Sequence, residues 1–275
     1  MKAHLALRKK STENDNILKW LSDFCANEAS CKNSYSLLSI GSGSGVLEVP
    51  LISNVRKVSN VNFVGVDPNR VENEECRKQL ETISPGCDGN TNMILDTTFE
   101  EFEETHSFDT VIAVHSHYYF DDLSEFIAKA LRLLHTDGKL VVVSGINEDP
   151  LRTYQKQASL KFYNTQYLLS DDIISAVQKL GASYECHTIN SWINGQCFDE
   201  SPTSSDSNDL LNFLIHADSS GLDQREHHRV LNIVLDHAVK HEGRLYFPHV
   251  VKAIVVYPGT YDNEFPPNFS GYQDN

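Results

Sequence analysis

Short apolar runs alternate with amphipathic segments along the first half of the chain. The apolar runs lie at 35–40, 61–67, 91–95, 108–116 and 139–145. Segments with apolar residues at helical spacing lie at 12–28, from Val46 onward, at 70–82 and at 123–134. Strands that alternate with helices of this length form βαβ units in a largely parallel sheet. The pattern therefore predicts an α/β fold.

The alternation loosens after residue 146. Residues 170–189 predict one more helix–strand unit, and 209–215 and 225–240 predict two helices. The Ser-rich stretch DESPTSSDSND, 199–209, predicts a loop, and 244–257 predicts a closing pair of strands. No repeat or linker divides the chain, so we expect one domain over 1–257 and a disordered tail at 258–275.

The composition limits the kinds of partner that the chain can bind. The net charge of −15, from 23 Lys and Arg against 38 Asp and Glu, argues against nucleic acid, because phosphate binding needs clustered basic residues. It fits a cationic small molecule, and it equally fits an acidic surface that serves solubility. The six cysteines form no C-x-x-C pair, and no run reaches the roughly 20 apolar residues of a membrane span. We expect a cytoplasmic protein with reduced thiols.

The histidines show no metal-ligand spacing such as H-E-x-x-H, so we expect no bound metal. No long apolar heptad repeat is present either. This favours a monomer.

Three glycines alternate with serines in LLSIGSGSGVLEVPLI, residues 37–52, between an apolar run and a helical segment. A strand, a Gly-rich turn and a helix place bare backbone N–H groups beside a ligand, and glycine has no Cβ to keep that ligand away. The dinucleotide fingerprint G-x-G-x-x-G fails because its third position is Val46, and the P-loop motif is absent. The turn is G-x-G-x-G and predicts a nucleotide-like ligand.

Asp67 ends the second predicted strand, 26 residues after Gly41. A carboxylate at this place accepts the hydroxyls of an adenosine ribose. An Asp before Pro68 is also a good helix-start signal, and one carboxyl group can serve both roles. Together with the turn, Asp67 predicts an adenosine-type cofactor.

The G-x-G-x-G turn, the acid after the next strand and the later segment ALRLLHTDGKLVVVSG resemble the class I S-adenosylmethionine-dependent methyltransferases. The resemblance implies a Rossmann-like fold with a doubly wound, mostly parallel seven-stranded sheet, helical elements over the substrate, and S-adenosylmethionine as cofactor. The cofactor half would be about 35–145, with substrate and lid elements at 1–30 and 146–250. One departure is Ser39, because many members carry an acid two positions before the first glycine.

Further segments resemble, in order along the chain, those of the histamine N-methyltransferase family: STENDNILKWL, VGVDPN, HSHYYFDD, SDDIISAVQKLGASYEC and EGRLYF. This resemblance implies cofactor contacts at Gly41, Gly43, Gly45, Asp67, Glu72, Thr98 and Val114. It implies that Glu13 receives a cationic amine and that Tyr119 and Phe213 line the pocket. His115 and His249 stand where the family has a glutamine and an asparagine that touch the substrate, which makes them the candidate catalytic residues, as bases or as orienting groups.

Each of these residues also has a purely structural explanation. Glu13 near a helix start could serve the helix dipole. His115 and His117 both follow a buried strand, and one of them could be a hydrogen-bonded core histidine. Tyr119 could be a packed aromatic residue.

Three functions therefore stay open. The first is a small-molecule N-methyltransferase acting on an imidazole or a biogenic amine such as histamine. The second is the same fold acting on another small acceptor, such as a carboxylated or peptide-like imidazole or an oxygen nucleophile. The third is a catalytically silent, methyltransferase-like binding protein.

Overall fold

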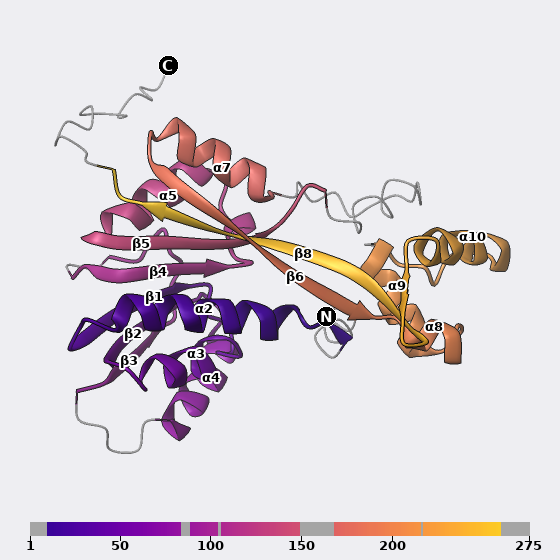
Figure 1. Ribbon diagram of the computed structural model, residues 1–275, viewed down its shortest axis with the longest axis horizontal. Helices are drawn as coiled ribbons and strands as arrows, with labels where there is room; N and C mark the ends of the chain where they lie inside the picture. Colours follow the sequence, from indigo (N-terminus) through magenta and orange to yellow (C-terminus); the bar gives the residue numbers. More distant parts are fainter. Residues whose placement is uncertain (1–9, 84–88, 104–105, 149–167, 216, 260–275) are drawn as a thin grey trace.

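The computed structural model describes residues 10–83, 89–103, 106–148, 168–215 and 217–259 (Figure 1). Its centre is a sheet with the strand order β3-β2-β1-β4-β5-β8-β6. The strands are β1 (Ser34–Ile40), β2 (Asn60–Val66), β3 (Thr91–Leu95), β4 (Phe108–Val114), β5 (Leu134–Gly145), β6 (Ser183–Asn194) and β8 (Arg244–Tyr257). The first five are parallel, and β8 is antiparallel to both β5 and β6. This confirms the predicted mostly parallel, seven-stranded sheet. A short eighth strand, β7 (Val239–His241), pairs with β8.

Helices cover both faces of the sheet, as the doubly wound prediction requires. One apolar core joins the sheet to α2 (Glu13–Ala29), α3 (Glu48–Val55) and α4 (Arg70–Thr82). The other core joins it to α5 (Leu123–Arg132) and α7 (Ser170–Lys179). Figure 1 shows these two helical layers on either side of the strands. The central strands are buried from both faces, which explains their continuous apolar runs.

A third apolar cluster lies where β6 and β8 extend beyond the other strands, on the right of Figure 1. It is built by α8 (Gln196–Glu200), α9 (Ser205–Ile215), α10 (Gln224–Leu235) and the far ends of these two strands. Lys10 pairs with Asp206 of α9 at 2.8 Å, so the segment before α2 is tied to this cluster.

Two predictions for the second half are wrong. The stretch 199–209 is mostly helical, with only 201–204 between α8 and α9. Its serines act as local caps, since Ser204 Oγ accepts the N–H of Ser207 at 3.2 Å. The stretch 244–257 is one long strand instead of a pair. Pro248 is tolerated there because β5 pairs only with 251–256 and β7 only with 244–246, which leaves one side of the strand without a ladder at that position.

Smaller differences concern element ends. The helix expected from Val46 begins at Glu48, because the turn extends further than expected. The helix expected at 225–240 ends at Leu235, and 239–241 belong to β7. The strand expected at 139–145 begins at Leu134, with an irregularity where Phe108 pairs with Leu134 and Thr110 pairs with Lys139.

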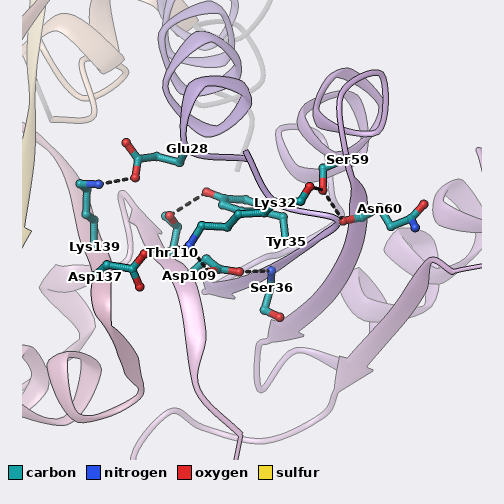
Figure 2. Close-up of polar contacts among 10 residues, drawn as sticks. All are labelled: Glu28, Lys32, Tyr35, Ser36, Ser59, Asn60, Asp109, Thr110, Asp137 and Lys139. Atoms are coloured by element: carbon teal, nitrogen blue, oxygen red, sulfur yellow. Dashed lines mark hydrogen bonds and ion pairs between the residues drawn. The ribbon is translucent and has the colours of Figure 1, made fainter. Parts of the chain in front are cut away.

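A group of polar side chains braces β1 against β4 at the amino-terminal end of both strands (Figure 2). Tyr35 Oη donates to Thr110 Oγ1 at 2.7 Å, and both side chains are fully buried. Asp109 accepts the backbone N–H of Ser36 at 2.7 Å and pairs with Lys32 at 2.5 Å. These contacts fix the register of the two strands, and that register decides which residues meet at their opposite, carboxyl ends.

Several predictions fall outside the described residues. They concern Cys87, residues 260–275 of the expected tail, residues 1–9 of the amino-terminal element and 149–167 of the lid region. The five described cysteines have free thiols. Within the described ranges, no helix is long and apolar enough to cross a membrane.

Candidate functional site

The carboxyl ends of the parallel strands bring the predicted cofactor residues to one edge of the sheet. The glycine turn follows β1, Asp67 follows β2, Thr98 lies after β3 and His115 follows β4. The strand order reverses direction between β1 and β4, and open α/β sheets bind ligands at such a switch point. Ser116, after β4, links the ends of β1 and β4, because its Oγ donates to the carbonyl of Ile40 at 2.7 Å.

The three alternating glycines all have a positive φ, but their surroundings differ. Gly41, Gly43 and Gly45 have φ of 75°, 51° and 78°, in the left-handed region that favours glycine. A Cβ on Gly41 would lie 2.5 Å from Ser116 Cβ, and one on Gly45 would lie 2.6 Å from Cys76 Sγ. A Cβ on Gly43 would have no neighbour within 4 Å among the described residues. Gly41 and Gly45 thus allow close packing within the protein, and only Gly43 faces open space.

Asp67 is tied to that open glycine. Its Oδ2 accepts the N–H of Gly43 at 3.0 Å, and its Oδ1 accepts the N–H of Asn69 at 2.8 Å. The predicted helix-capping role of Asp67 is wrong, because the N-cap of α4 is Asn69, whose side chain accepts from Val71 and Glu72. A carboxylate has about four lone-pair positions, so Asp67 keeps the capacity to accept ribose hydroxyls.

The other predicted cofactor residues lie around this edge. Glu72 is exposed in the first turn of α4, and the half-buried Thr98 accepts the N–H of Glu101 on its Oγ1 at 3.3 Å. Val114 is the last residue of β4, is half-buried and packs against the first core. The hydroxyl of Ser42, inside the turn, is buried and has no hydrogen-bond partner in the part of the chain that the structure describes. An unpaired buried hydroxyl between bare glycines fits a polar ligand at this turn.

Glu13, His115 and His249 meet although they come from three distant parts of the chain. Oε1 of Glu13 lies 2.8 Å from Nε2 of His115 and 3.3 Å from Nε2 of His249. Glu13 and His249 are buried, and the side chain of His115 is 33% exposed. A carboxylate oxygen only accepts, so each Nε2 carries the hydrogen, and Nδ1 of a neutral His115 is then an acceptor.

The start of α2 is placed by β6. The backbone N–H of Thr12 donates to the carbonyl of Trp192 at 3.0 Å, and Thr12 Oγ1 accepts the N–H of Trp192. Asn16 donates to the carbonyl of Asn190 at 3.0 Å. His249 on β8 is the register partner of Ser191 on β6, which carries it to the same place.

The electrostatics of the three residues are coupled. Burial by itself would raise the pKa of Glu13, but the charge and hydrogen bonds of His115 and His249 hold that pKa well below its usual range. Glu13 is therefore an anion at neutral pH. His115 has a φ of 50°, which is uncommon for a residue with a Cβ and is held here by the end of β4 and by Glu13.

His117 plays a different part. It is almost fully buried, its Nε2 donates to the carbonyl of Leu168 at 2.9 Å, and it lies 3.1 Å from Ser144 Oγ. Burial lowers the pKa of His117 to about 4, although the Leu168 carbonyl opposes this. Of the two histidines after β4, His117 is thus the core histidine, and His115 belongs to the cluster with Glu13.

The predicted aromatic lining is less clearly placed. Tyr119 lies in a single 3-10 turn (His117–Tyr119), is 77% exposed and packs against Tyr118 with 4.7 Å between the ring centroids. Phe213 lies on α9 and packs against the third cluster. Their contact with a substrate stays a prediction.

Sequence reasoning missed Ser116 and Glu48. Ser39 Oγ donates to Oε1 of the buried Glu48 at 3.0 Å, so a carboxyl group lies under the glycine turn after all. Two signals were available: the absent acid at Ser39, and an acid inside the apolar run VLEVPLI.

Comparison with known proteins adds the family. A model of the methyltransferase domain matches residues 38–140. A predicted methyltransferase from Bacillus halodurans C-125 has a similar structure, with a TM-score of 0.55 and 14% identity over 88% of this chain and 99% of that one. Residues 38–140 carry a methyltransferase domain. The cofactor of this domain class is S-adenosylmethionine.

Two further proteins are similar to this chain. YcgJ from Bacillus subtilis has a TM-score of 0.56 and 13% identity, over 86% of this chain and 97% of that one. Histamine N-methyltransferase from Cavia porcellus is 27% identical over 185 residues, which is 62% of this chain. The match spans 63% of the length of that relative. Within the described ranges, the chain has no group of three or more His, Cys, Asp or Glu side chains that could hold a metal ion.

Proposed function

We propose that this methyltransferase transfers the methyl group of S-adenosylmethionine to a nitrogen of a small imidazole or a related biogenic amine such as histamine. The observation that carries the proposal is the meeting of Glu13, His115 and His249 directly beside the glycine turn. His115 is the residue after Val114, and Ser116 bonds to the end of β1. The likeness to a histamine N-methyltransferase supports the same class of acceptor.

The residues at the carboxyl edge would hold the cofactor. We assign the methionine end and the ribose to Gly41, Asp67 and Glu72, and the adenine to Thr98 and Val114. Gly43 would let the ligand approach the backbone, because no atom of the described segments lies within 4 Å of its Cβ position. Bound S-adenosylmethionine supplies an electrophilic methyl group on a positively charged sulfur, and the remaining work falls to the chain's own residues.

Glu13 would anchor the acceptor. Its Oε1 receives both imidazoles, and a carboxylate has about four lone-pair positions, so it keeps the capacity to accept from a cationic or N–H-bearing substrate. A charge-assisted contact of this kind is worth about 1.5–3 kcal/mol. The burial of Glu13 strengthens it, because little water competes.

His115 would orient the acceptor nitrogen and receive its proton. With Nε2–H donated to Glu13, Nδ1 of the neutral ring can accept the proton that the acceptor nitrogen loses. Glu13 fixes this tautomer. His249, on β8, contacts the same carboxylate oxygen. Methyl transfer is an in-line displacement, so holding the acceptor in place is the main catalytic contribution. Tyr119 and Phe213 would supply aromatic lining.

We further propose a cytoplasmic monomer without a nucleic-acid or membrane partner. The acidic composition speaks against nucleic acid, and the scattered cysteines support the cytoplasm. Light scattering on the purified chain would measure its mass in solution. A mass twice that of one chain would contradict the monomer.

The test of the function is methyl transfer itself. The full chain is incubated with S-adenosylmethionine labelled in its methyl group and with histamine, histidine, an imidazole dipeptide, a primary amine and a catechol, each alone. We expect label in histamine or another imidazole amine, and none with Asp67→Ala. Label only in the catechol would move the acceptor to oxygen. Cofactor binding without transfer to any acceptor would indicate a silent binding protein.

A further inference from the structure

Glu48 places a buried carboxyl group under the glycine turn. It begins α3, three residues after Gly45, and its side chain reaches back to Ser39, two residues before Gly41. Ser39 Oγ donates to Glu48 Oε1 at 3.0 Å, and the two residues are 2% and 5% exposed. The Ser39–Glu48 contact therefore closes the base of the turn whose Gly43 faces open space.

The surroundings of Glu48 contain hydrogen-bond donors and a second acid. Besides the Ser39 hydroxyl on β1, the backbone N–H groups of Leu47 and Glu48 stabilise its charged form, and Asp67 after β2 and Cys76 on α4 lie within electrostatic range. Burial raises the pKa of Glu48 to about 7, and Asp67 adds to this rise.

A buried carboxyl group without a cation is unfavourable, and it becomes favourable when a cation arrives next to it. The cofactor of this domain class brings positive charge to the turn, on its sulfonium sulfur and its ammonium group. We propose that Glu48 supplies the negative charge that complements the cationic methionine end of the cofactor, so that cofactor binding and the loss of a proton from Glu48 are coupled. This inference rests on the proposed function, because it needs S-adenosylmethionine at this turn.

The coupling is a simple exchange. The neutral carboxylic acid of Glu48 releases its proton to solvent, and the resulting carboxylate faces the positive charge of the bound ligand while the Ser39 hydroxyl still donates to it. Glu48 acts through space and through Ser39, and is thus a positioning residue. A ligand without the cationic methionine end gains nothing from the carboxylate. Glu48 would therefore make the turn selective for a cationic cofactor.

Calorimetry in two buffers with different heats of ionisation measures the protons released on binding. At pH 6.5 the α-amino group of the ligand is almost fully protonated, since such groups titrate near pH 7.7–8.0. We expect wild-type protein to release between about 0.3 and 0.8 proton on binding S-adenosylmethionine, given a carboxyl group that titrates near neutrality. We expect release near zero on binding 5′-methylthioadenosine, which lacks the amino-acid end and the sulfonium charge. Equal release with both ligands would overturn the inference.

A substitution of Glu48 provides a second test of this coupling. Glu48→Gln keeps the shape and the bond to Ser39 but cannot ionise, and we expect it to abolish the proton release. It should also weaken S-adenosylmethionine about five- to tenfold at pH 8 and change 5′-methylthioadenosine less than twofold. Glu81→Gln removes an exposed acid from the far end of α4 and should change neither ligand. Unchanged release and affinity in Glu48→Gln would sink the inference while leaving the function standing. Failure of wild-type protein to bind S-adenosylmethionine would instead contradict the proposed function, and the inference with it.

Discussion

Glu13 Oε1 lies 2.8 Å from His115 Nε2, although 102 positions separate the two residues in the chain. The contact joins the start of α2 to the end of β4, at the edge of the sheet where the glycine turn lies. It exists because the backbone of Thr12 is paired with Trp192 on β6 and because His115, the residue after β4, has a positive φ. The proposed acceptor site thus depends on the long β6–β8 pair as much as on the parallel strands.

The open side of the glycine turn can be tested with a matched pair of substitutions. Gly43 and Gly181 have φ of 51° and 67°, and a Cβ at either position meets nothing within 4 Å. Both Gly43→Ala and Gly181→Ala should lose about 1–2 kcal/mol of unfolding free energy, because a Cβ is disfavoured in this backbone region. Only Gly43→Ala should weaken S-adenosylmethionine, which calorimetry would show. Equal affinities in the two variants would place the ligand elsewhere.

The pH dependence of stability should change when Glu48 is replaced. The folded-state pKa of Glu48 is about 7, above the ordinary 4.5, so the folded protein binds this proton more tightly and loses stability as the pH rises from 4.5 to 7. The loss amounts to about 3 kcal/mol. Glu48→Gln should remove it, so that the stability gain of the variant over wild type grows between pH 5 and pH 8. Urea unfolding at both pH values measures it, and a constant difference would contradict the prediction.

His117 should act in the opposite direction. Its folded-state pKa of about 4 lies below the ordinary 6.5, so the unfolded chain binds the proton more tightly, and stability is lost as the pH falls from 6.5 to 4. His117→Gln should make the protein less sensitive to acid in this range, by up to about 3 kcal/mol. Between pH 4.5 and 6.5, Glu48 makes the free energy of unfolding fall with rising pH, and His117 makes it rise. The Glu48 variant should therefore make the pH dependence more positive, and the His117 variant should make it more negative. Identical profiles would refute both assignments.

The brace between β1 and β4 also has a measurable energy. Tyr35→Phe leaves the buried Thr110 hydroxyl without its donor and should cost about 1–3 kcal/mol of unfolding free energy. Adding Thr110→Val removes the second polar group, and the double variant should recover part of that loss. Strictly additive effects in denaturant titrations would show that the hydrogen bond contributes nothing.

The sequence supports the prediction of the first five strands because each buried strand is a continuous apolar run bounded by turns. The sequence also identifies the glycine turn and Asp67, because a ligand beside the backbone needs glycines and an adenosine ribose needs a carboxylate at this spacing. The second half is harder. The Ser-rich stretch predicts a loop although Ser204 caps α9, and 244–257 predicts two strands although it forms the single strand β8. Local patterns do not show which neighbour a strand lacks.

The residues of the candidate site divide in the same way. Positional resemblance singled out Glu13, His115 and His249 separately, and the structure brings them together. The sequence alone does not distinguish the roles of His115 and His117, because both follow the same strand. Only the contacts with Leu168 and Ser144 show that His117 is the buried one. Positional resemblance also passed over Glu48, since an acid in an apolar helix gains its meaning only from the strand residue that it contacts.

The most direct test of the account compares Glu13→Gln with Asp15→Asn, which removes an exposed acid from the same first turn of α2. We expect Glu13→Gln to lower kcat/KM for the methylated acceptor by about ten- to a hundredfold, because a charge-assisted contact is lost. We expect unchanged affinity for S-adenosylmethionine in both variants, and kcat/KM within twofold of wild type for Asp15→Asn. If Glu13→Gln keeps the wild-type kcat/KM for every acceptor that is methylated, the acceptor is not held by this cluster and the central claim fails.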